Sequence, residues 1–594
     1  MNGLKPHAEF LFEVSWEVCN KVGGIYSVLT SKAALMNKYY KGRYILIGPY
    51  FEQRVKGEFQ ECPPSKAYEN VFGQLKKEGI TCHFGNWLVK GEPFVILIDF
   101  KEAWKEVNTI KRALWDDFSV DSLYSGYDFD EPLVWAHSVG KVVEKFVALF
   151  KGKRLVAQFH EWLSGAGLLY LKEHGVPIGT VFTTHATTLG RTLAFHNIDF
   201  YSRFKEINPD EKARELHVHE KHQLEKQAAL HATIFTTVSE ITGLEAEHFL
   251  GRKPGVILPN GLDANQFLNF EEIAWKHQVQ RNRLREFLFS YFFPYYTFDL
   301  EETLFYFIAS RYEFRAKGIG LFINALALLN KRLVETKSKN TVVVFFWVPS
   351  QVKQVNPELL ENRELYQDVR DYLEETSHET KERLLYTIME GKRLNDKTMF
   401  QEDVLFEIKK RILKFKREGT PPLATHYLTN PHDQILRAFV QAGLDNKKSD
   451  RVKVIFYPVY LSGHDGLTNL NYFESIQASH FGIFPSLYEP WGYTPLETAA
   501  FGVASLTLTL SGFGQFCHKF VKGKKSPGIF VLEGFDKSDE TLVEEMGDVL
   551  YRFSQFSRRE RIENKIQARK VAALADWKAL IKNYIIAHNS AVEK

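Results

Sequence analysis

Two glutamates late in the chain, Glu489 and Glu497, have a spacing that suggests chemistry. They lie eight positions apart in SLYEPWGYTPLE, directly after the short apolar run HFGIFP. The segment Thr494-Pro495-Leu496-Glu497 fits a helix capping box, with Thr494 as N-cap and Glu497 at N3, so Glu497 has a structural explanation. Glu489 precedes the expected helix and has none. Because burial of an unpaired carboxylate is costly, we expect Glu489 to face a polar cleft.

Basic side chains follow the ends of predicted strands in two segments. His185 and Arg191 lie in TTHATTLGR, and Arg311 and Lys317 lie in SRYEFRAKG. Open α/β sheets bind their ligands at the carboxyl ends of the strands. Two cations facing a cleft there would hold a departing diphosphate and neutralise its charge as it leaves. Either segment alone would be surface charge by default, but their shared position at strand ends favours a site.

A glycine loop is the third candidate feature. Lys21, Gly23 and Gly24 lie in EVCNKVGGIYSVL, between the first predicted strand and a helix. In such a loop, backbone N–H groups approach a diphosphate at a helix N-terminus. A KxGG sequence by itself is a weak signal, because paired glycines more often only turn the chain. Its place after the first strand gives it weight.

These residues need a scaffold on which strand ends converge. Apolar runs alternate with amphipathic stretches almost throughout, which is typical of parallel doubly wound sheets. We therefore predict an α/β fold of two Rossmann-like lobes. The predicted strands of the first lobe lie at 10–16, 43–50, 93–100, 154–162, 178–186 and 232–240, and those of the second at 304–312, 341–348, 451–459, 480–485 and 503–509.

The chain divides into four predicted parts. They are an N-terminal lobe (1–266), a C-terminal lobe in two pieces (267–350 and 419–577), a helical insertion (351–418) and a C-terminal helix (578–594) that packs back on the N-terminal lobe. In the charged insertion, apolar residues fall on one face of each of two helices: Leu365, Val369, Tyr372 and Leu373, then Leu405, Ile408, Ile412 and Phe415. These helices either lie on their own lobe or project as an oligomerisation arm, since exposed apolar stripes need a partner.

Composition excludes several classes of protein. A chain of 594 residues is too long for one core, and 44% hydrophobic with 25% charged residues is typical of a soluble globular protein. A net charge of +3 is too small to indicate nucleic-acid or membrane binding. The four cysteines have no CxxC spacing, and no apolar run approaches the ~20 residues of a membrane helix. With no signal peptide recognisable, we expect a reducing cytoplasm.

The motifs together resemble a known family. FEVSWEVCNKVGGIYSVL, QFHEW, TTHATTLGR, LPNGLD, SRYEFRAKG, FPSLYEPWGYTPLE and LSGFGQF occur in the order found in glycogen synthases of the animal and fungal type. The resemblance runs from about residue 9 to about residue 588. It implies a retaining glycosyltransferase of GT-B architecture that transfers glucose from UDP-glucose to the non-reducing end of glycogen or another α-1,4-glucan. The N-terminal lobe would face the acceptor and the C-terminal lobe the nucleotide sugar.

The resemblance also assigns roles to individual residues. Glu489 would be the carboxylate beside the donor glucose, and Glu497 would hold the ribose hydroxyls in place of its capping role. Arg311 and Lys317 would grip the distal diphosphate, with Arg191 and His185 at the reaction centre. The other substrate-binding residues are Lys21, Gly23, Gly24, His160, Asn260 at the glucose, Tyr472 on the uracil, and Trp491, Gly492, Tyr493 and Thr494, whose backbone N–H groups would meet the phosphates.

The chemistry leaves two routes open. The transition state should resemble an oxocarbenium ion, as in glycoside hydrolysis. Retention follows from a covalent intermediate on Glu489 or from front-face attack in which the leaving phosphate takes the acceptor proton, and the resemblance favours the second. No metal and no other cofactor is implied. The rivals are a transferase with another donor or acceptor, such as ADP-glucose or a sucrose- or trehalose-making enzyme, an inactive glucan-binding scaffold, and a pyridoxal-phosphate glucan phosphorylase.

Regulation and assembly are predicted from the family as well. The resemblance implies a homotetramer and a helix whose arginines bind glucose-6-phosphate. Three of the family's arginine positions carry arginine in this chain, namely Arg558, Arg559 and Arg561. Three further positions carry Lys565, Gln567 and Lys570 instead. Lysine cannot give the bidentate fork that suits phosphate oxygens, and Gln567 carries no charge. We therefore expect constitutive activity in a bacterial or other divergent member that lacks the family's phosphorylatable tails.

Overall fold

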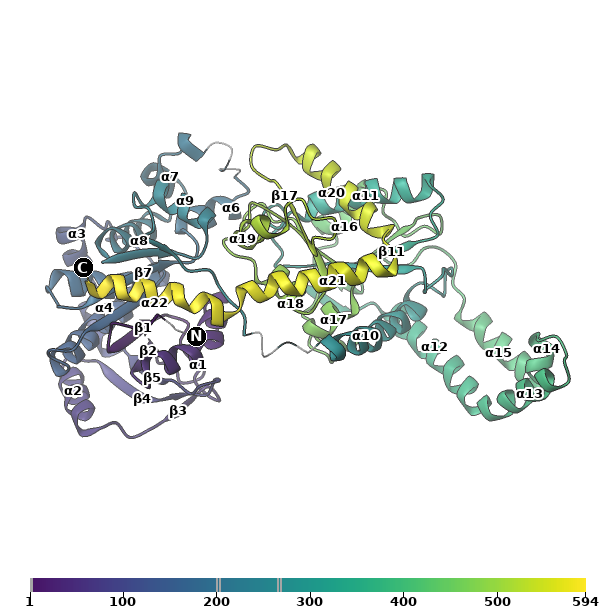
Figure 1. Cartoon of the computed structure of the whole chain (residues 1–594), viewed down its shortest axis with the longest axis horizontal. Helices are drawn as coiled ribbons and strands as arrows, with labels where there is room; N and C mark the ends of the chain where they lie inside the picture. The colour runs from purple at the N-terminus through teal and green to yellow at the C-terminus, as the bar shows by residue number, and fades with distance from the viewer. Residues whose placement is uncertain (1–3, 199–200, 202–203, 264–266, 268–269, 594) are drawn as a thin grey trace.

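The computed structural model describes residues 4–198, 201, 204–263, 267 and 270–593. They form two lobes, with a helical arm projecting from the C-terminal one (Figure 1). The predicted strand runs all form strands, so the α/β fold of two Rossmann-like lobes is confirmed.

The N-terminal sheet has the order β3-β4-β5-β2-β1-β6-β7-β8-β9. Its strands from β5 to β9 run parallel, and β3 and β4 add an antiparallel edge. The strands are β1 (Phe10–Val14), β2 (Tyr44–Pro49), β3 (Phe59–Glu61), β4 (Thr81–Trp87), β5 (Phe94–Asp99), β6 (Leu155–His160), β7 (Gly179–Thr184), β8 (Ile234–Thr237) and β9 (Val256–Ile257). The helices are α1 (Gly24–Tyr40), α2 (Lys66–Lys77), α3 (Val107–Phe118), α4 (Tyr127–Leu149), α5 (Trp162–Glu173), α6 (Thr188–Phe195), α7 (Pro209–Glu215), α8 (His219–His231) and α9 (Glu240–Phe249).

The C-terminal sheet is parallel throughout, in the order β14-β11-β10-β15-β16-β17. Its central strands read as continuous apolar runs because helices cover both faces. The strands are β10 (Thr303–Ala309), β11 (Thr341–Trp347), β14 (Val452–Tyr457), β15 (Phe481–Phe484), β16 (Ala504–Leu508) and β17 (Ile529–Leu532). The helices are α10 (Phe270–Tyr291), α11 (Ile319–Glu335), α16 (Gln434–Gln441), α17 (Tyr472–Ala478), α18 (Tyr493–Ala500), α19 (Gly512–Val521), α20 (Asp539–Ser554) and α21 (Arg558–Ala572).

Each sheet has a point where the strand order reverses. In the N-terminal sheet it lies between β1 and β6, and in the C-terminal sheet between β10 and β15. Loops diverge to opposite sides of the sheet at such a point and leave a crevice at the carboxyl ends of the strands. The candidate residues follow these strands or their neighbours, so the topology gathers them on the facing edges of the lobes.

The last helix, α22 (Trp577–Glu593), returns the chain to the N-terminal lobe. It packs on α1, β6 and β7, so both chain ends lie on that lobe (Figure 1). The chain passes between the lobes twice, near Leu262 and near Ala575, and these two segments lie side by side. The Leu262 N–H donates to the Ala575 carbonyl, and the Trp577 N–H donates to the Leu262 carbonyl. Residues 264–266, within the predicted junction, lie outside the described residues.

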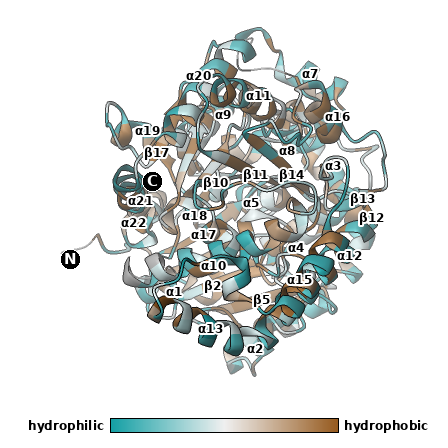
Figure 2. Cartoon of the chain, turned by 90° about the vertical axis from the view of Figure 1, so that its right-hand side faces the viewer, coloured by the Kyte–Doolittle hydropathy of each residue, from teal (hydrophilic) through white to brown (hydrophobic). Residues whose placement is uncertain are grey.

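The insertion forms the projecting arm. It contains α12 (Pro357–Glu375), α13 (Ser377–Met389), α14 (Asp396–Met399) and α15 (Glu402–Phe415), and a ribbon of β12 (Val352–Val355) and β13 (His426–Leu428) closes its base. This ribbon was not predicted, because its strands are short and contain polar residues. Figure 2 views the molecule from the arm side, where α13 and α15 carry hydrophobic residues among hydrophilic ones.

Candidate functional site

Glu489 and Lys317 are in contact where the C-terminal sheet reverses its order. Lys317 follows β10, Glu489 follows β15, and the Lys317 Nζ donates to Glu489 Oε2 at 2.6 Å. The Lys317 side chain is 9% exposed and that of Glu489 is 27% exposed. The structure thus brings these two predicted residues together in a partly open ion pair at a ligand-binding edge.

A glycine fixes the loop that carries Lys317. Gly318 has φ of 65°, and a Cβ on it would lie 2.0 Å from the carbonyl oxygen of Pro485. The Leu487 N–H also donates to the Ala316 carbonyl at 2.8 Å. Only glycine allows this close approach, so backbone contacts between the two loops hold Lys317 beside Glu489.

Arg311 is placed differently from its predicted partner Lys317. Its side chain is 74% exposed and forms an ion pair with Glu313 at 3.0 Å. Within the described ranges of the chain, neither a hydrogen bond nor an ion pair joins Arg311 to Glu489. The arginine is therefore accessible to a ligand, but the structure does not bring it into contact with the Lys317–Glu489 pair.

The predicted capping box at α18 is wrong. Gly492 is the N-cap with φ of 108°, so the helix begins at Tyr493, ahead of Thr494, and no side chain caps it. A left-handed glycine starts the helix early and moves Thr494 and Glu497 out of capping register. The uncapped N–H groups at this helix start can receive an anion.

Glu497 instead has a partner on α17. The Tyr472 hydroxyl donates to Glu497 Oε2 at 2.9 Å, and burial raises the pKa of Glu497 to about 7. The pair lies on the side of α18 next to the uncapped turn, which is compatible with a hydroxyl-binding role. Trp491 packs against Phe513 and Phe516, so its side chain belongs to the core, and Tyr493 packs against the same core.

In the N-terminal lobe, His185 and Arg191 lie on the loop and helix after β7. The His185 backbone N–H donates to Glu161 Oε1 at 3.0 Å, and the Arg191 guanidinium lies 4.0 Å from the same oxygen. The Arg191 side chain is 63% exposed. Arg191 is thus an accessible cation next to a buried carboxylate.

Glu161 is a residue that the sequence reasoning missed. It follows β6 directly, with φ of 65° and ψ of 167°, a backbone region that is essentially restricted to glycine. Such a conformation costs about 1–3 kcal/mol and persists where the surrounding structure determines it. The carboxylate accepts from the N–H groups of His185 and Ala186, and so orients the loop that carries His185. The available signal was the QFHEW motif at a strand end.

Two further buried carboxylates hold the same loop. Glu225 accepts from the Thr188 N–H and the Thr184 hydroxyl, and burial raises its pKa to about 8. Glu245 accepts from the Thr187 hydroxyl and from Tyr488, the neighbour of Glu489 in the other lobe. Burial raises the pKa of Glu245 to about 7. No local sequence pattern marks these residues, because they reach the loop from α8 and α9.

His160, which was predicted to bind substrate, is placed differently from His185. This last residue of β6 is buried, and both ring nitrogens are engaged: Nε2 with Glu13 at 2.7 Å and Nδ1 with His185 at 2.9 Å. His160 therefore lies behind His185 rather than in the open site. The sequence could not indicate which way the side chain points at the end of the strand.

The glycine loop holds a carboxylate of the chain itself. The backbone N–H groups of Gly23 and Tyr26 both donate to Glu17 Oε2 at 2.8 Å, while Lys21 is exposed. Glu17, another residue that sequence reasoning missed, thus engages donors at this helix start. Gly24, which begins α1, has open space around it.

Asn260 and a cavity between the lobes also belong to the candidate site. Asn260 is buried at the lobe junction, and its Oδ1 has no hydrogen-bond partner among the residues described. A cavity of about 380 Å³ opens between the lobes, lined by residues that include Ala194, Ala316, Tyr488 and Phe535. These neighbours of Arg191, Lys317 and Glu489 place it beside the candidate site. In the described part of the chain, no group of three or more side chains has metal-ligating geometry, and no helix is long and apolar enough to cross a membrane.

Comparisons with known proteins point to one family. The family model for glycogen synthase matches residues 13–594. Liver glycogen [starch] synthase of Homo sapiens is 38% identical over 580 residues, covering 97% of this chain and 82% of that protein. Glycogen [starch] synthase of Dictyostelium discoideum is 38% identical over 587 residues, covering 98% of this chain and 66% of that protein, so the chain spans just under two thirds of that relative.

A solved structure supports the fold. The catalytic domain of starch synthase IV from Arabidopsis thaliana, bound to ADP and acarbose, has a TM-score of 0.51 at 13% identity, covering 99% of this chain and all of that one. At this identity the likeness shows the GT-B fold alone. The sequence matches extend over almost the whole chain, and this chain belongs to the glycogen synthase family.

Proposed function

We propose that this protein is a glycogen synthase that transfers glucose from UDP-glucose to the non-reducing end of an α-1,4-glucan, with retention of configuration. One observation carries the proposal within a chain of this family: the Lys317–Glu489 pair at the reversal point of the C-terminal sheet. A carboxylate and a cation at one point match a reaction that builds positive charge on a sugar and negative charge on a leaving diphosphate.

The C-terminal lobe would bind the nucleotide sugar. Glu497 and Tyr472 together offer a carboxylate and a hydroxyl for the ribose, and the uncapped start of α18 would receive the phosphates. Tyr472 uses its hydroxyl toward Glu497, which leaves its ring face for the uracil. Lys317 and the exposed Arg311 would then neutralise the diphosphate as it leaves.

Glu489 would act at the sugar. Its carboxylate would counter the charge of an oxocarbenium-like transition state and orient the glucose. Lys317 engages Oε2 of this carboxylate, which reduces its strength as a nucleophile and favours the front-face route. The N-terminal lobe would supply Arg191 and His185, and the cavity between the lobes would admit the acceptor end.

The proposal is tested with labelled UDP-glucose and glycogen, comparing wild type with Glu489→Gln. The amide keeps the size of the side chain and removes its charge, so we expect glucosyl transfer to be abolished while UDP binding remains. Glu301→Gln, which breaks the exposed ion pair with Arg285, is the matched control and should leave transfer unchanged. Near-normal turnover of Glu489→Gln would exclude the catalytic role of this residue.

Substitution of Lys317 and Arg311, the two cations proposed to hold the diphosphate, should lower turnover to different extents. Lys317→Ala should lower turnover by ~10²–10³, the usual loss when one electrostatic stabiliser of a transition state is removed. Arg311→Ala should cost less than Lys317→Ala, because Arg311 is exposed and pairs with Glu313 rather than with Glu489. Steady-state rates at saturating UDP-glucose measure both effects. Unchanged turnover in both variants would refute the proposed role of these two cations.

Donor competition tests the proposed use of UDP-glucose. A UDP-release assay with UDP-glucose and ADP-glucose in competition separates a glycogen synthase from a transferase with another donor. With glycogen or a trehalose-forming acceptor as alternatives, the same assay separates the acceptors. The cytoplasmic location stays a prediction, which the four free cysteines are compatible with.

We also propose that the arm joins subunits into a homotetramer. Most of the apolar stripe predicted on α15 is covered within the arm, because α15 packs on α12: Ile408 and Phe415 are buried and Leu405 is half-buried. The large exposed apolar side chains of α13 and α15 are Leu385, Tyr386, Ile388, Met389, Phe406, Ile412 and Leu413. They supply the apolar surface that a second copy would cover.

Light scattering tests the assembly. Phe406→Asp combined with Leu413→Asp should lower the mass of the particle without unfolding the arm, since both side chains are exposed. Glu364→Lys on α12 is the matched control, because it changes charge at an exposed polar position of the arm. A wild-type protein that is monomeric at micromolar concentration would rule the assembly out.

A further inference from the structure

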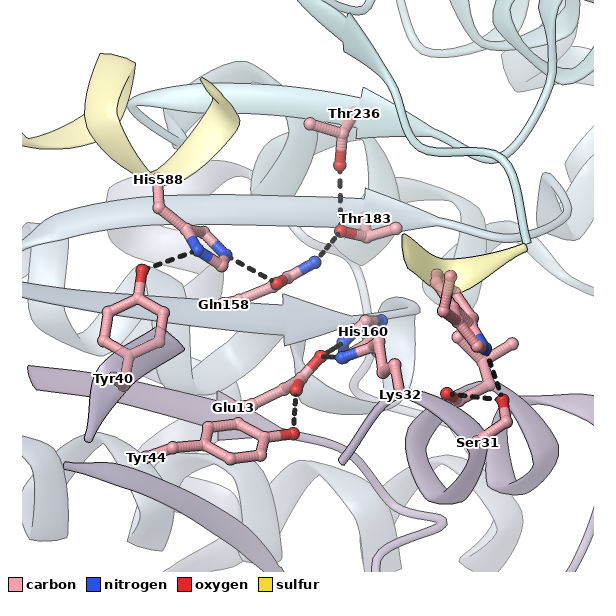
Figure 3. A network of polar contacts seen from close by, with 12 residues as sticks. Glu13, Ser31, Lys32, Tyr40, Tyr44, Gln158, His160, Thr183, Thr236 and His588 are labelled. Atoms are coloured by element: carbon pink, nitrogen blue, oxygen red, sulfur yellow. Dashed lines mark hydrogen bonds and ion pairs between the residues drawn. The ribbon is translucent and has the colours of Figure 1, made fainter. Parts of the chain in front are cut away.

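A complete ion pair is buried behind the candidate site in the N-terminal lobe. Glu13 of β1 and Lys32 of α1 contact each other, and neither side chain is exposed to solvent (Figure 3). The Tyr44 hydroxyl and the ring of His160 also donate to the Glu13 carboxylate. Well-packed hydrophobic residues often stabilise a protein at least as much as a buried ion pair does. Stability is therefore a weak explanation for this pair, and its contacts point to another.

The contacts of His160 connect Glu13 to the reaction centre. His160 Nε2 lies 2.7 Å from Glu13 Oε1, and His160 Nδ1 lies 2.9 Å from His185 Nε2. A carboxylate that receives hydrogen bonds from Lys32 and Tyr44 can only accept, so Nε2 of His160 must carry the proton. Nδ1 of a neutral His160 is then an acceptor, and Nε2 of His185 must donate to it.

This direction of donors fixes the tautomer of His185. A neutral imidazole carries one N–H, and in His185 that N–H is used at Nε2 toward His160. Among the residues that the structure describes, no hydrogen bond engages Nδ1 of His185. That nitrogen keeps its lone pair, and it can accept a hydrogen bond but cannot donate one.

We propose that Glu13 is a positioning residue that acts through His160 to hold His185 as its Nε2–H tautomer, so that Nδ1 of His185 accepts a hydrogen bond from a hydroxyl group of the sugar substrate. The inference rests on the proposed function in one respect, which is that His185 contacts the sugar. Neither Glu13 nor His160 touches the substrate. Their contribution is the fixed direction of the donors.

Protonation of the three groups supports this assignment. Burial alone would raise the pKa of Glu13, but the charge of Lys32 and the hydrogen bond from His160 outweigh it and hold that pKa well below its usual range. Burial also lowers the pKa of His160 and, together with the nearby His160 and Arg191, puts that of His185 well below its usual range. Both imidazoles are then neutral at physiological pH.

The C-terminal helix closes the network from outside. The Lys32 Nζ lies 4.9 Å from the centre of the Tyr584 ring, and His588 bonds to Tyr40 and Gln158 in the layer next to Glu13 (Figure 3). Water is excluded from the Glu13 side by this cover. The hydrogen bonds of Glu13 therefore cannot be replaced by bonds to water, and the direction of the donors along Glu13, His160 and His185 stays fixed.

The first measurement is made on the wild-type protein. A long-range ¹H–¹⁵N correlation spectrum of histidine-labelled protein distinguishes protonated from bare ring nitrogens, and comparison with His185→Gln assigns the signals. We expect His185 to be protonated at Nε2 and bare at Nδ1, with the same pattern in His160. A His185 protonated at Nδ1, or charged, would overturn the proposal whether or not the protein transfers glucose.

The second measurement uses a pair of variants at the same carboxylate. Glu13→Gln combined with Lys32→Met removes the charge and its buried counter-ion together. Its amide can donate to Nε2 of His160, which lets the proton of His185 move to Nδ1. We expect a changed tautomer signal and a fall in kcat of ~10-fold or more, as for one lost hydrogen bond, with a smaller change in the KM for UDP-glucose.

Tyr44→Phe is the matched control. It removes a hydrogen bond from the other oxygen of Glu13 and leaves the contact to His160 in place. It should lower the melting temperature while the tautomer and kcat stay as in wild type. A double variant with a changed tautomer but wild-type kcat would overturn the proposal, as would equal losses of kcat in the double variant and in Tyr44→Phe. An inactive wild type with the expected tautomer would contradict the proposed function alone.

Discussion

The two lobes bury charge in different ways, and the difference separates fixed parts of the molecule from adjustable ones. In the N-terminal lobe, Glu13 and Lys32 form a balanced pair. In the C-terminal lobe, Arg281 of α10 lies with Arg561 and Lys565 of α21, and Lys565 contacts His277. In the described part of the chain, none of these three cations forms an ion pair with a carboxylate.

This difference affects the protonation of the buried lysines. Lys32 keeps a carboxylate in direct contact, so the pair can stay charged. At Lys565, burial and the neighbouring Arg281 and Arg561 lower the pKa to about 7. A balanced pair defines fixed hydrogen-bond directions, whereas a cluster of cations reduces its charge by releasing a proton. The first suits positioning, and the second makes a region sensitive to pH and to anions.

The largest expected effect comes from breaking the balanced pair. Glu13→Leu leaves Lys32 buried without its counter-ion, and we expect a loss of about 3–5 kcal/mol in the free energy of unfolding. Glu13→Leu combined with Lys32→Leu should be more stable than the single variant, because no charge is left unpaired, but less stable than wild type, because Tyr44 and His160 lose their acceptor. Urea unfolding measures both. A single variant as stable as the double would show that the pair is not tightly coupled.

Removing a cation from the cluster of Arg281, Arg561 and Lys565 should stabilise the protein. Lys565 has a pKa near 7 when folded and an ordinary lysine pKa when unfolded, so folding is penalised where Lys565 is charged. The penalty is full below about pH 7 and disappears as pH rises through the unfolded pKa of about 10.4. Lys565→Met should therefore raise the melting temperature most below pH 7. Lys570→Met, exposed on the same helix, is the control and should change little at any pH.

The elements of the fold were predictable because their signals are local. Apolar runs such as TVVVFFW have little alternative to a buried parallel strand, and β11 is buried along its whole length. Glu489 was identified by a similar argument, since no local capping role explained it. β4 and the ribbon of β12 and β13 were missed because they are partly exposed strands in which polar residues interrupt the apolar pattern.

The errors in the site arise from information that the sequence does not hold locally. Thr494 fits a capping box by spacing, but the left-handed backbone at Gly492 starts the helix earlier. His160 has the chemistry of a binding residue, but the partner that turns it inward, Glu13, is 147 positions away. Glu245 reaches the loop of Arg191 from 58 positions beyond Thr187. Such contacts depend on the tertiary fold and have no sequence period.

The smallest expected effect concerns glucose-6-phosphate. Lysine at 565 gives a point charge rather than a fork, it is only partly protonated near pH 7, and Gln567 adds no charge. We therefore expect activity at low UDP-glucose to rise less than tenfold with millimolar glucose-6-phosphate. Any remaining stimulation should be larger at about pH 6.5 than at about pH 8.5, because Lys565 gains its charge below 7 while the ligand keeps most of its own. Lys565→Met should remove that difference and Lys570→Met should keep it. A rise of tenfold or more at pH 8.5, worth about 1.4 kcal/mol of coupling, would show that the arginines alone form an effective site and that the charge of Lys565 is not needed.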